Sequence, residues 1–96
     1  MQEKVRGKIG KPVYGSGDVV LFKMPQVRDW DGNVILEAGE IEGVVEIVDA
    51  FGTFEQNFEP SYDILAVLNG EKTLVKHIPE SEVIKKIRRA EAEERL

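Results

Sequence analysis

The chain has 96 residues and a net charge of −5, with 42% hydrophobic and 32% charged residues, a balance that excludes a disordered chain and suits one domain around a single core. Cys is absent, so a disulfide framework and a thiolate zinc site are both excluded. No apolar run approaches the length of a membrane span, and we therefore expect no membrane contact.

The N-terminal residues 1–14 are predicted to form a basic arm ahead of the folded domain. The arm begins MQEKVRGKIGK, which carries charges in place of the apolar core of a signal peptide, so we expect a cytoplasmic protein. The first strand follows in VVLFKM, residues 19–24. This β-branched and aromatic run lies between a turn cluster at Gly15 to Asp18 and the strand-ending Pro25.

Two further β segments are expected in the middle of the chain. Residues 27–36, VRDWDGNVIL, place Asp31-Gly32 between short apolar arms, which predicts a hairpin because Gly accepts a positive φ without steric cost. Residues 39–51, GEIEGVVEIVDAF, alternate imperfectly. They predict a strand in which Gly43 marks either a bulge or a close approach of another chain segment.

The last third of the chain predicts a hairpin followed by a helix. Residues 62–68 and 73–78 are apolar runs joined by Asn69-Gly70, a strong signal for a two-residue hairpin turn. The segment 79–96 begins with Pro and carries two Glu in its first turn, as the N-terminus of a helix favours. Its first two turns are expected to dock and the rest to be solvated.

Taken together, these elements predict a mainly β domain. Four to five short strands separated by turns over residues 15–78 favour a small antiparallel barrel or sandwich over alternating β and α units. The predicted helix over residues 79–96 then closes the domain.

Three stretches carry a resemblance to a known fold family. In chain order, GDVVLF, GVVEIVD and YDILAVLNGEKTLVKHIPESEVI resemble small SH3-like barrels of the Tudor and KOW kind, over roughly residues 15–84. In layout the chain is similar to uncharacterised prophage-encoded proteins, for which the resemblance implies a fold and no activity. A KOW-type relation implies RNA or ribosome contact through a basic loop, whereas the corresponding stretch here is acidic.

Catalysis finds little support in the residue types available. His77 is the only His, and the three Ser residues stand outside any nucleophile-elbow context. These are Ser16, Ser61 and Ser81. We therefore predict that the protein is not an enzyme and uses no cofactor.

One segment resembles a calcium loop in its spacing. Residues 29–40, DWDGNVILEAGE, place Asp29, Asp31 and Asn33 at the first, third and fifth positions and Glu40 at the twelfth. The sixth position, which needs Gly in an EF-hand, is Val34. An acidic hairpin turn is the favoured interpretation, and no metal site is predicted.

The charges are segregated along the chain. Residues 1–28 carry a net +4, residues 29–71 a net −11 with no Lys or Arg, and residues 72–96 a net +2. Such a layout either favours a basic partner near the middle segment or is neutralised within the domain by pairing of the basic ends with the acidic middle.

The acidic middle also holds an unusual number of aromatic rings. Phe51, Phe54 and Phe58 are spaced as on one helical turn. Two interpretations stay open, since the rings either pack into the core or form an acidic aromatic contact surface. The predicted partner-binding residues are Trp30, Asp49, Phe51, Phe54, Glu55, Phe58, Glu59, Tyr62 and Asp63.

The function expected from these features is a non-catalytic protein-interaction module that grips a basic protein surface. With the prophage resemblance, it would be a phage or prophage accessory protein acting on a nucleic-acid-handling host protein. The alternative is a nucleic-acid-binding barrel that uses the basic arm and the start of the last helix. Its candidate residues are Lys85, Lys86, Arg88 and Arg89.

Overall fold

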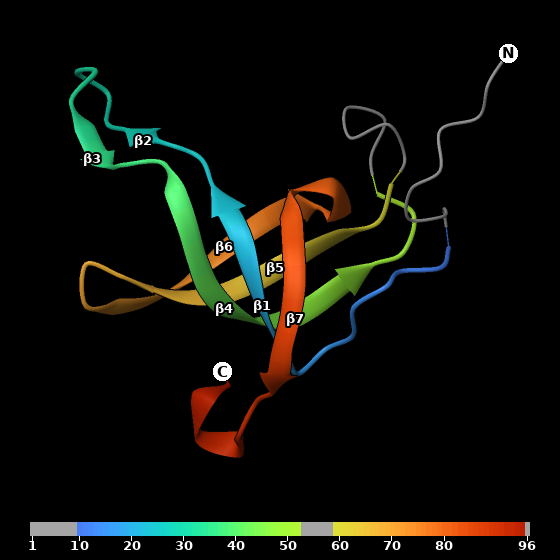
Figure 1. The fold of residues 1–96 in the computed structure, drawn as a ribbon. Helices are drawn as coiled ribbons and strands as arrows, with labels where there is room; N and C mark the ends of the chain where they lie inside the picture. The colour runs from blue at the N-terminus through green and yellow to red at the C-terminus, as the bar shows by residue number, and fades with distance from the viewer. Residues whose placement is uncertain (1–9, 53–58, 96) are drawn as a thin grey trace, which may run out of the picture.

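The computed structural model describes residues 10–52 and 59–95. The protein is mainly β, and the strands form one five-stranded antiparallel sheet, in the order β6-β5-β4-β1-β7, and a separate β2-β3 hairpin (Figure 1). The elements are β1 Asp18–Met24, β2 Val27–Arg28, β3 Val34–Leu36, β4 Gly39–Asp49, β5 Ser61–Leu68, β6 Glu71–Pro79, the 3-10 turn η2 Glu80–Glu82, β7 Val83–Arg89 and the 3-10 turn η3 Ala92–Glu94.

The sheet curls around a single main core, so that β5 and β6 run across β1 and β7 (Figure 1). All five strands contribute to this core, and the prediction of a compact, mainly β domain is confirmed. Its buried residues are Val20, Phe22, Met24, Val45, Tyr62, Ile64, Ala66, Ile78 and Val83. A smaller cluster of Val19, Val44 and Leu65 lies apart from it, packed against Leu74 and Ala90.

Gly43 lets two strands approach closely, which confirms one of the two roles expected for it. A Cβ atom at this position would lie 2.5 Å from Cγ2 of Ile64 and 2.8 Å from the carbonyl oxygen of Leu65. The register irregularity between β4 and β5 lies farther along, between Val45 and Ile47. Glycine therefore serves here to make room for β5.

Both predicted hairpins are confirmed, but the two-residue turn is confirmed only at Asn69-Gly70. Asn69 and Gly70 have φ values of 52° and 83° and join β5 to β6, as a turn of type I′ requires. At the β2-β3 hairpin, the backbone bonds from Gly32 to the carbonyl of Asp29 and from Asp29 to that of Asn33 close a three-residue loop over residues 30–32. Gly32 has a φ of 86° at the tip of the β2-β3 hairpin.

The expected closed barrel is wrong, because the sheet is open. Strands β6 and β7 form its two edges, and no ladder joins them in residues 10–52 and 59–95. Pro79 ends β6 without a backbone donor, and η2 separates it from β7.

The predicted C-terminal helix is also wrong. Its expected first turn is the single 3-10 turn η2, and the residues after it form β7, which pairs with β1. The helix signals at Pro79 and Glu80 suit a 3-10 turn equally well. Without β7, the outer backbone groups of β1 would be left without partners, and the β-branched Val83 fills the core.

The described part of the predicted N-terminal arm is attached to the domain. The backbone N–H of Gly10 donates to the carbonyl of Ala50 at 2.7 Å, and the ring of Tyr14 lies edge-on to that of Tyr62 with centroids 5.7 Å apart. Residues 10–14 are therefore part of the folded domain. No helix in the described part of the chain is long and apolar enough to cross a membrane.

Candidate functional site

The tip of the β2-β3 hairpin is fixed by its own hydrogen bonds. Oδ1 of Asp29 accepts from the backbone N–H groups of Asp31 and Asn33, both at 2.9 Å. Two backbone bonds close the same turn, from Asp29 to the carbonyl of Asn33 at 3.0 Å and from Gly32 to that of Asp29 at 3.1 Å. The bond from the Asn33 backbone is the main cause that holds the pKa of Asp29 below its usual range, so its carboxylate stays charged.

Trp30 stands on this fixed tip with its side chain fully exposed, at 103% relative exposure. The base of the hairpin is anchored, because Val27 and Leu36 pack against the main core. Val34 and Ile35 are also exposed. The hairpin projects from the sheet (Figure 1) and carries a large apolar surface in a defined position.

An open, shallow hollow lies beside the indole ring, lined by Arg28, Asp29, Trp30 and Ile35. The guanidinium of Arg28 is held by the hairpin itself, with Nη1 donating to the carbonyl of Gly32 at 2.6 Å. An apolar wall and a charged carboxylate therefore border the same space.

Tyr62 was assigned to the contact surface but belongs to the core, with 1% of its surface exposed. Its hydroxyl donates to Oε1 of Glu80 at 2.5 Å and accepts from the backbone N–H of Tyr14 at 3.2 Å. Glu59 is buried as well, and its Oε1 accepts from the backbone N–H of Ser81 at 2.6 Å. Neither Tyr62 nor Glu59 is placed to touch a partner.

The other described acids of the predicted site accept hydrogen bonds from backbone N–H groups. Oδ1 of Asp49 accepts from the N–H groups of Phe51 and Gly52, both at 3.0 Å. Oδ1 of Asp63 accepts from the N–H of His77 at 3.0 Å. Phe51 is 61% exposed. Three further residues of the prediction lie outside the described residues: Phe54, Glu55 and Phe58.

The predicted acidic aromatic surface is thus divided in the structure. Trp30 lies between β2 and β3, whereas Phe51 follows the C-terminal end of β4. This hairpin and that end of β4 lie on opposite sides of the view in Figure 1. Among the predicted partner-binding residues that the structure describes, these two have strongly exposed rings, and Trp30 is the more exposed.

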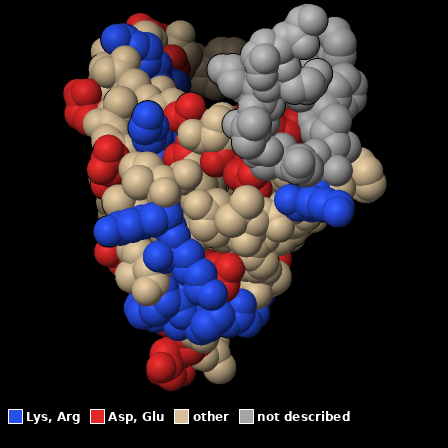
Figure 2. Space-filling view, turned by 45° about the vertical axis from the view of Figure 1, so that its right-hand side comes forward, with Lys and Arg blue, Asp and Glu red and all other residues tan. Residues whose placement is uncertain are grey.

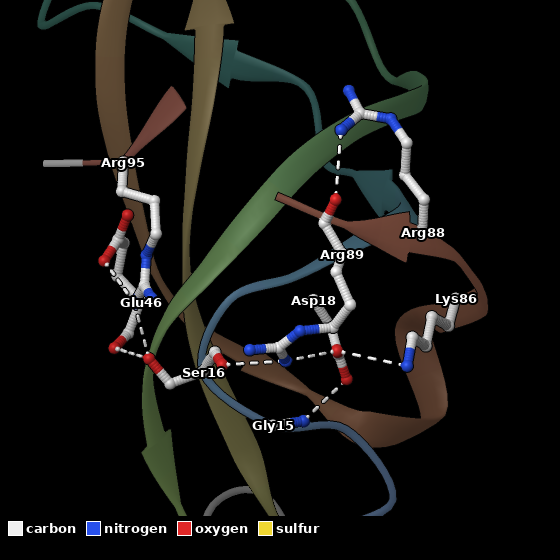
Figure 3. Close-up of polar contacts among 8 residues, drawn as sticks. All are labelled: Gly15, Ser16, Asp18, Glu46, Lys86, Arg88, Arg89 and Arg95. Atoms are coloured by element: carbon white, nitrogen blue, oxygen red, sulfur yellow. Dashed lines mark hydrogen bonds and ion pairs between the residues drawn. The ribbon is translucent and has the colours of Figure 1, made fainter. Parts of the chain in front are cut away.

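The alternative nucleic-acid site falls on β7, where Lys and Arg gather on the lower part of the face shown in Figure 2. Three of its four cations are held by carboxylates of the protein. Figure 3 shows two of them, Lys86 and Arg89, at the carboxylate of Asp18. Lys86 and Arg89 lie 3.3 and 2.8 Å from Oδ1 of the buried Asp18, and Arg88 lies 2.6 Å from Glu94.

This charged strand has the features of a protected sheet edge. Its pairing with β1 is interrupted twice, so that Ile84 and Ile87 have no opposite residue. Bulges and Lys residues are devices that keep an exposed edge from pairing with other chains.

The segregated charges are partly neutralised within the domain, since Arg95 lies 3.0 Å from Glu46 of the acidic middle segment.

His77 has a structural explanation. It has a φ of 62° at an irregularity where β6 has one residue more than β5, and Asp63 accepts the N–H that the ladder leaves unpaired. Within residues 10–52 and 59–95, no group of three His, Cys, Asp or Glu side chains is arranged to hold a metal ion.

The exposed apolar residues of β3 were missed by the sequence reasoning. The signal was the run Val34, Ile35, Leu36, because three consecutive apolar residues on a short strand cannot all face the core.

Comparison with protein family models, with curated protein sequences and with solved structures finds no match.

Proposed function

We propose that the protein is a non-catalytic protein-interaction module that binds a basic surface of its partner through the β2-β3 hairpin. The observation that carries this proposal is the fully exposed Trp30 on a hairpin tip held by Asp29. Trp is rarely so exposed in soluble proteins and is among the residues most enriched at binding hot spots.

The preference for a basic partner rests on charge. Trp30 lies between two carboxylates, Asp29 and Asp31. Glu37, which follows β3, and Glu40, at the start of β4, are exposed as well. Indole faces attract Lys and Arg, and neighbouring carboxylates add Coulomb attraction. Nucleic-acid-handling proteins present basic surfaces of the kind that would bind this hairpin. For a phage or prophage protein, the proposed partner is a host protein of that class.

We also propose that the chain shares the strand order of SH3-like domains, although its sheet does not close into a barrel. The last strand lies beside the first, and a short helical turn follows the paired strands β5 and β6. Both features support it.

The test is capture of partners from a lysate by the wild-type protein and by Trp30→Ala, with Val67→Ala as matched control, because Val67 is 65% exposed on β5. Burying an indole of about 200 Å² is worth at most about 5 kcal/mol, and hot-spot losses start near 2 kcal/mol. A basic protein that binds the wild type and Val67→Ala is therefore expected to bind Trp30→Ala at least about 30-fold more weakly. Equal binding by all three proteins would reject the hairpin as the contact.

A further inference from the structure

We infer that the hollow beside Trp30 receives the side chain of a single lysine of the partner protein. This inference rests on the proposed function and names the chemistry that the hairpin recognises. The hollow combines an apolar wall, an aromatic face and one charged carboxylate, all supplied by residues 28–35.

The apolar wall fits the stem of a long basic side chain. Trp30 and Ile35 are 103% and 51% exposed and line the hollow together. The four methylene groups of a lysine can lie along such a surface while the charged end stays at its rim. The ammonium group is also attracted by the face of the indole.

The carboxylate of Asp29 favours lysine over arginine. Its Oδ1 already accepts two backbone N–H groups at 2.9 Å, while its Oδ2 has only a long 3.4 Å contact with Nδ2 of Asn33. One oxygen is therefore available. A compact ammonium needs one acceptor, whereas the planar guanidinium of arginine reaches full strength by binding both carboxylate oxygens.

The single cation of the site is already engaged. Nη1 of Arg28 donates to the carbonyl of Gly32 at 2.6 Å, and its Nε donates to Oε1 of Gln26 at 3.0 Å. Asp31 next to Trp30 adds a second negative charge at the tip. The net charge around the hollow is therefore negative, and it favours the binding of one further cation.

The experiment is an NMR titration of the isotope-labelled full chain with three small probes: N-acetyl-lysine amide, N-acetyl-arginine amide and the uncharged N-acetyl-norleucine amide. Trp30 is the only Trp, so its indole N–H signal reports this site alone, and the side-chain amide of Asn33 reports the edge next to Asp29. We expect the lysine probe to shift both signals and to bind about fivefold more tightly than either other probe.

The matched variants are Asp29→Asn and Asp49→Asn. An Asn side chain keeps the oxygen that accepts the turn N–H groups, so both turns persist while one charge is lost. Asp29→Asn should lower the affinity of the lysine probe about fivefold, and Asp49→Asn should leave it unchanged. Equal binding of lysine and norleucine probes, equal or tighter binding of the arginine probe, or shifts that Asp29→Asn does not reduce would each overturn the inference.

Failure of this inference can be told apart from failure of the proposed function. If none of the probes shifts the Trp30 signal but a partner protein still loses binding with Trp30→Ala, the hairpin is the contact and the lysine pocket is wrong. If the lysine probe binds but Trp30→Ala leaves partner binding intact, the pocket exists and the proposed function is wrong.

Discussion

Replacing Tyr62 by Phe tests the buried hydrogen-bond network of its hydroxyl, which marks the residue as part of the core and not of a contact surface. The change removes the hydroxyl that donates to Glu80 at 2.5 Å and accepts from the Tyr14 backbone at 3.2 Å. Burial and the neighbouring Glu80 hold the pKa of Tyr62 above its ordinary value, so the hydroxyl stays protonated and keeps donating.

The expected cost follows from these two bonds. A hydrogen bond to a charged group contributes about 1.5–3 kcal/mol, and the Tyr14 N–H loses its acceptor. We expect the free energy of unfolding to fall by about 2 kcal/mol, which for a chain of this size lowers Tm by about 10 °C. Urea unfolding followed by circular dichroism measures the change.

Tyr14→Phe is the matched control, because the hydroxyl of Tyr14 makes no hydrogen bond within residues 10–52 and 59–95. It should change the free energy of unfolding by less than about 0.5 kcal/mol. If Tyr62→Phe costs no more than Tyr14→Phe, the reasoning about the buried network is refuted.

Three further predictions concern the sheet and its charges. Gly43→Ala should destabilise the fold by about 3 kcal/mol in urea unfolding, because its Cβ would lie 2.8 Å from the carbonyl oxygen of Leu65; a change below about 1 kcal/mol would contradict this close approach. Burial alone would raise the pKa of Asp18, but a backbone N–H, Arg89 and a Lys lower it below the ordinary 3.8. The carboxylate of Asp18 therefore stabilises the folded state fully above pH 3.8, and this stabilisation is lost as the pH falls through the lower pKa of the folded state. Asp18→Asn should flatten the dependence of the free energy of unfolding on pH in this range. An equal pH dependence in wild type and variant would contradict this role of Asp18. Arg88 lowers the pKa of Glu94 to about 2, so an NMR titration should show the carboxylate charged at pH 3, whereas Arg88→Gln should return its midpoint toward 4.5; a midpoint that does not move would exclude the ion pair.

Local sequence signals predicted the turns and most strands because the turn residues decide them. Asn69, Gly70 and Gly32 take positive φ values that other residues resist. The C-terminal segment was mispredicted because its state depends on a distant partner. The signals at Pro79 fit a helix and a 3-10 turn alike, and only the unpaired edge of β1 makes Val83–Arg89 a strand.

The candidate site was predicted in part, for a similar reason. Trp30 was expected beside the acidic segment 49–63; it is exposed, but on the separate β2-β3 hairpin. Tyr62 was misjudged because the aromatic spacing of the loop was weighed above the period of two in β5, in which Tyr62, Ile64 and Ala66 share the core face. The burial of Glu59 could not be anticipated, since its hydrogen bond with Ser81 joins the residues before β5 to η2 through the fold.

The most direct test of the hairpin as the binding surface is the intrinsic fluorescence of the protein, since its single Trp is Trp30. Addition of a basic partner protein that lacks Trp should shift the emission to shorter wavelengths with saturation, because the exposed indole becomes buried. Emission that stays unchanged while the partner is shown to be bound would contradict the account.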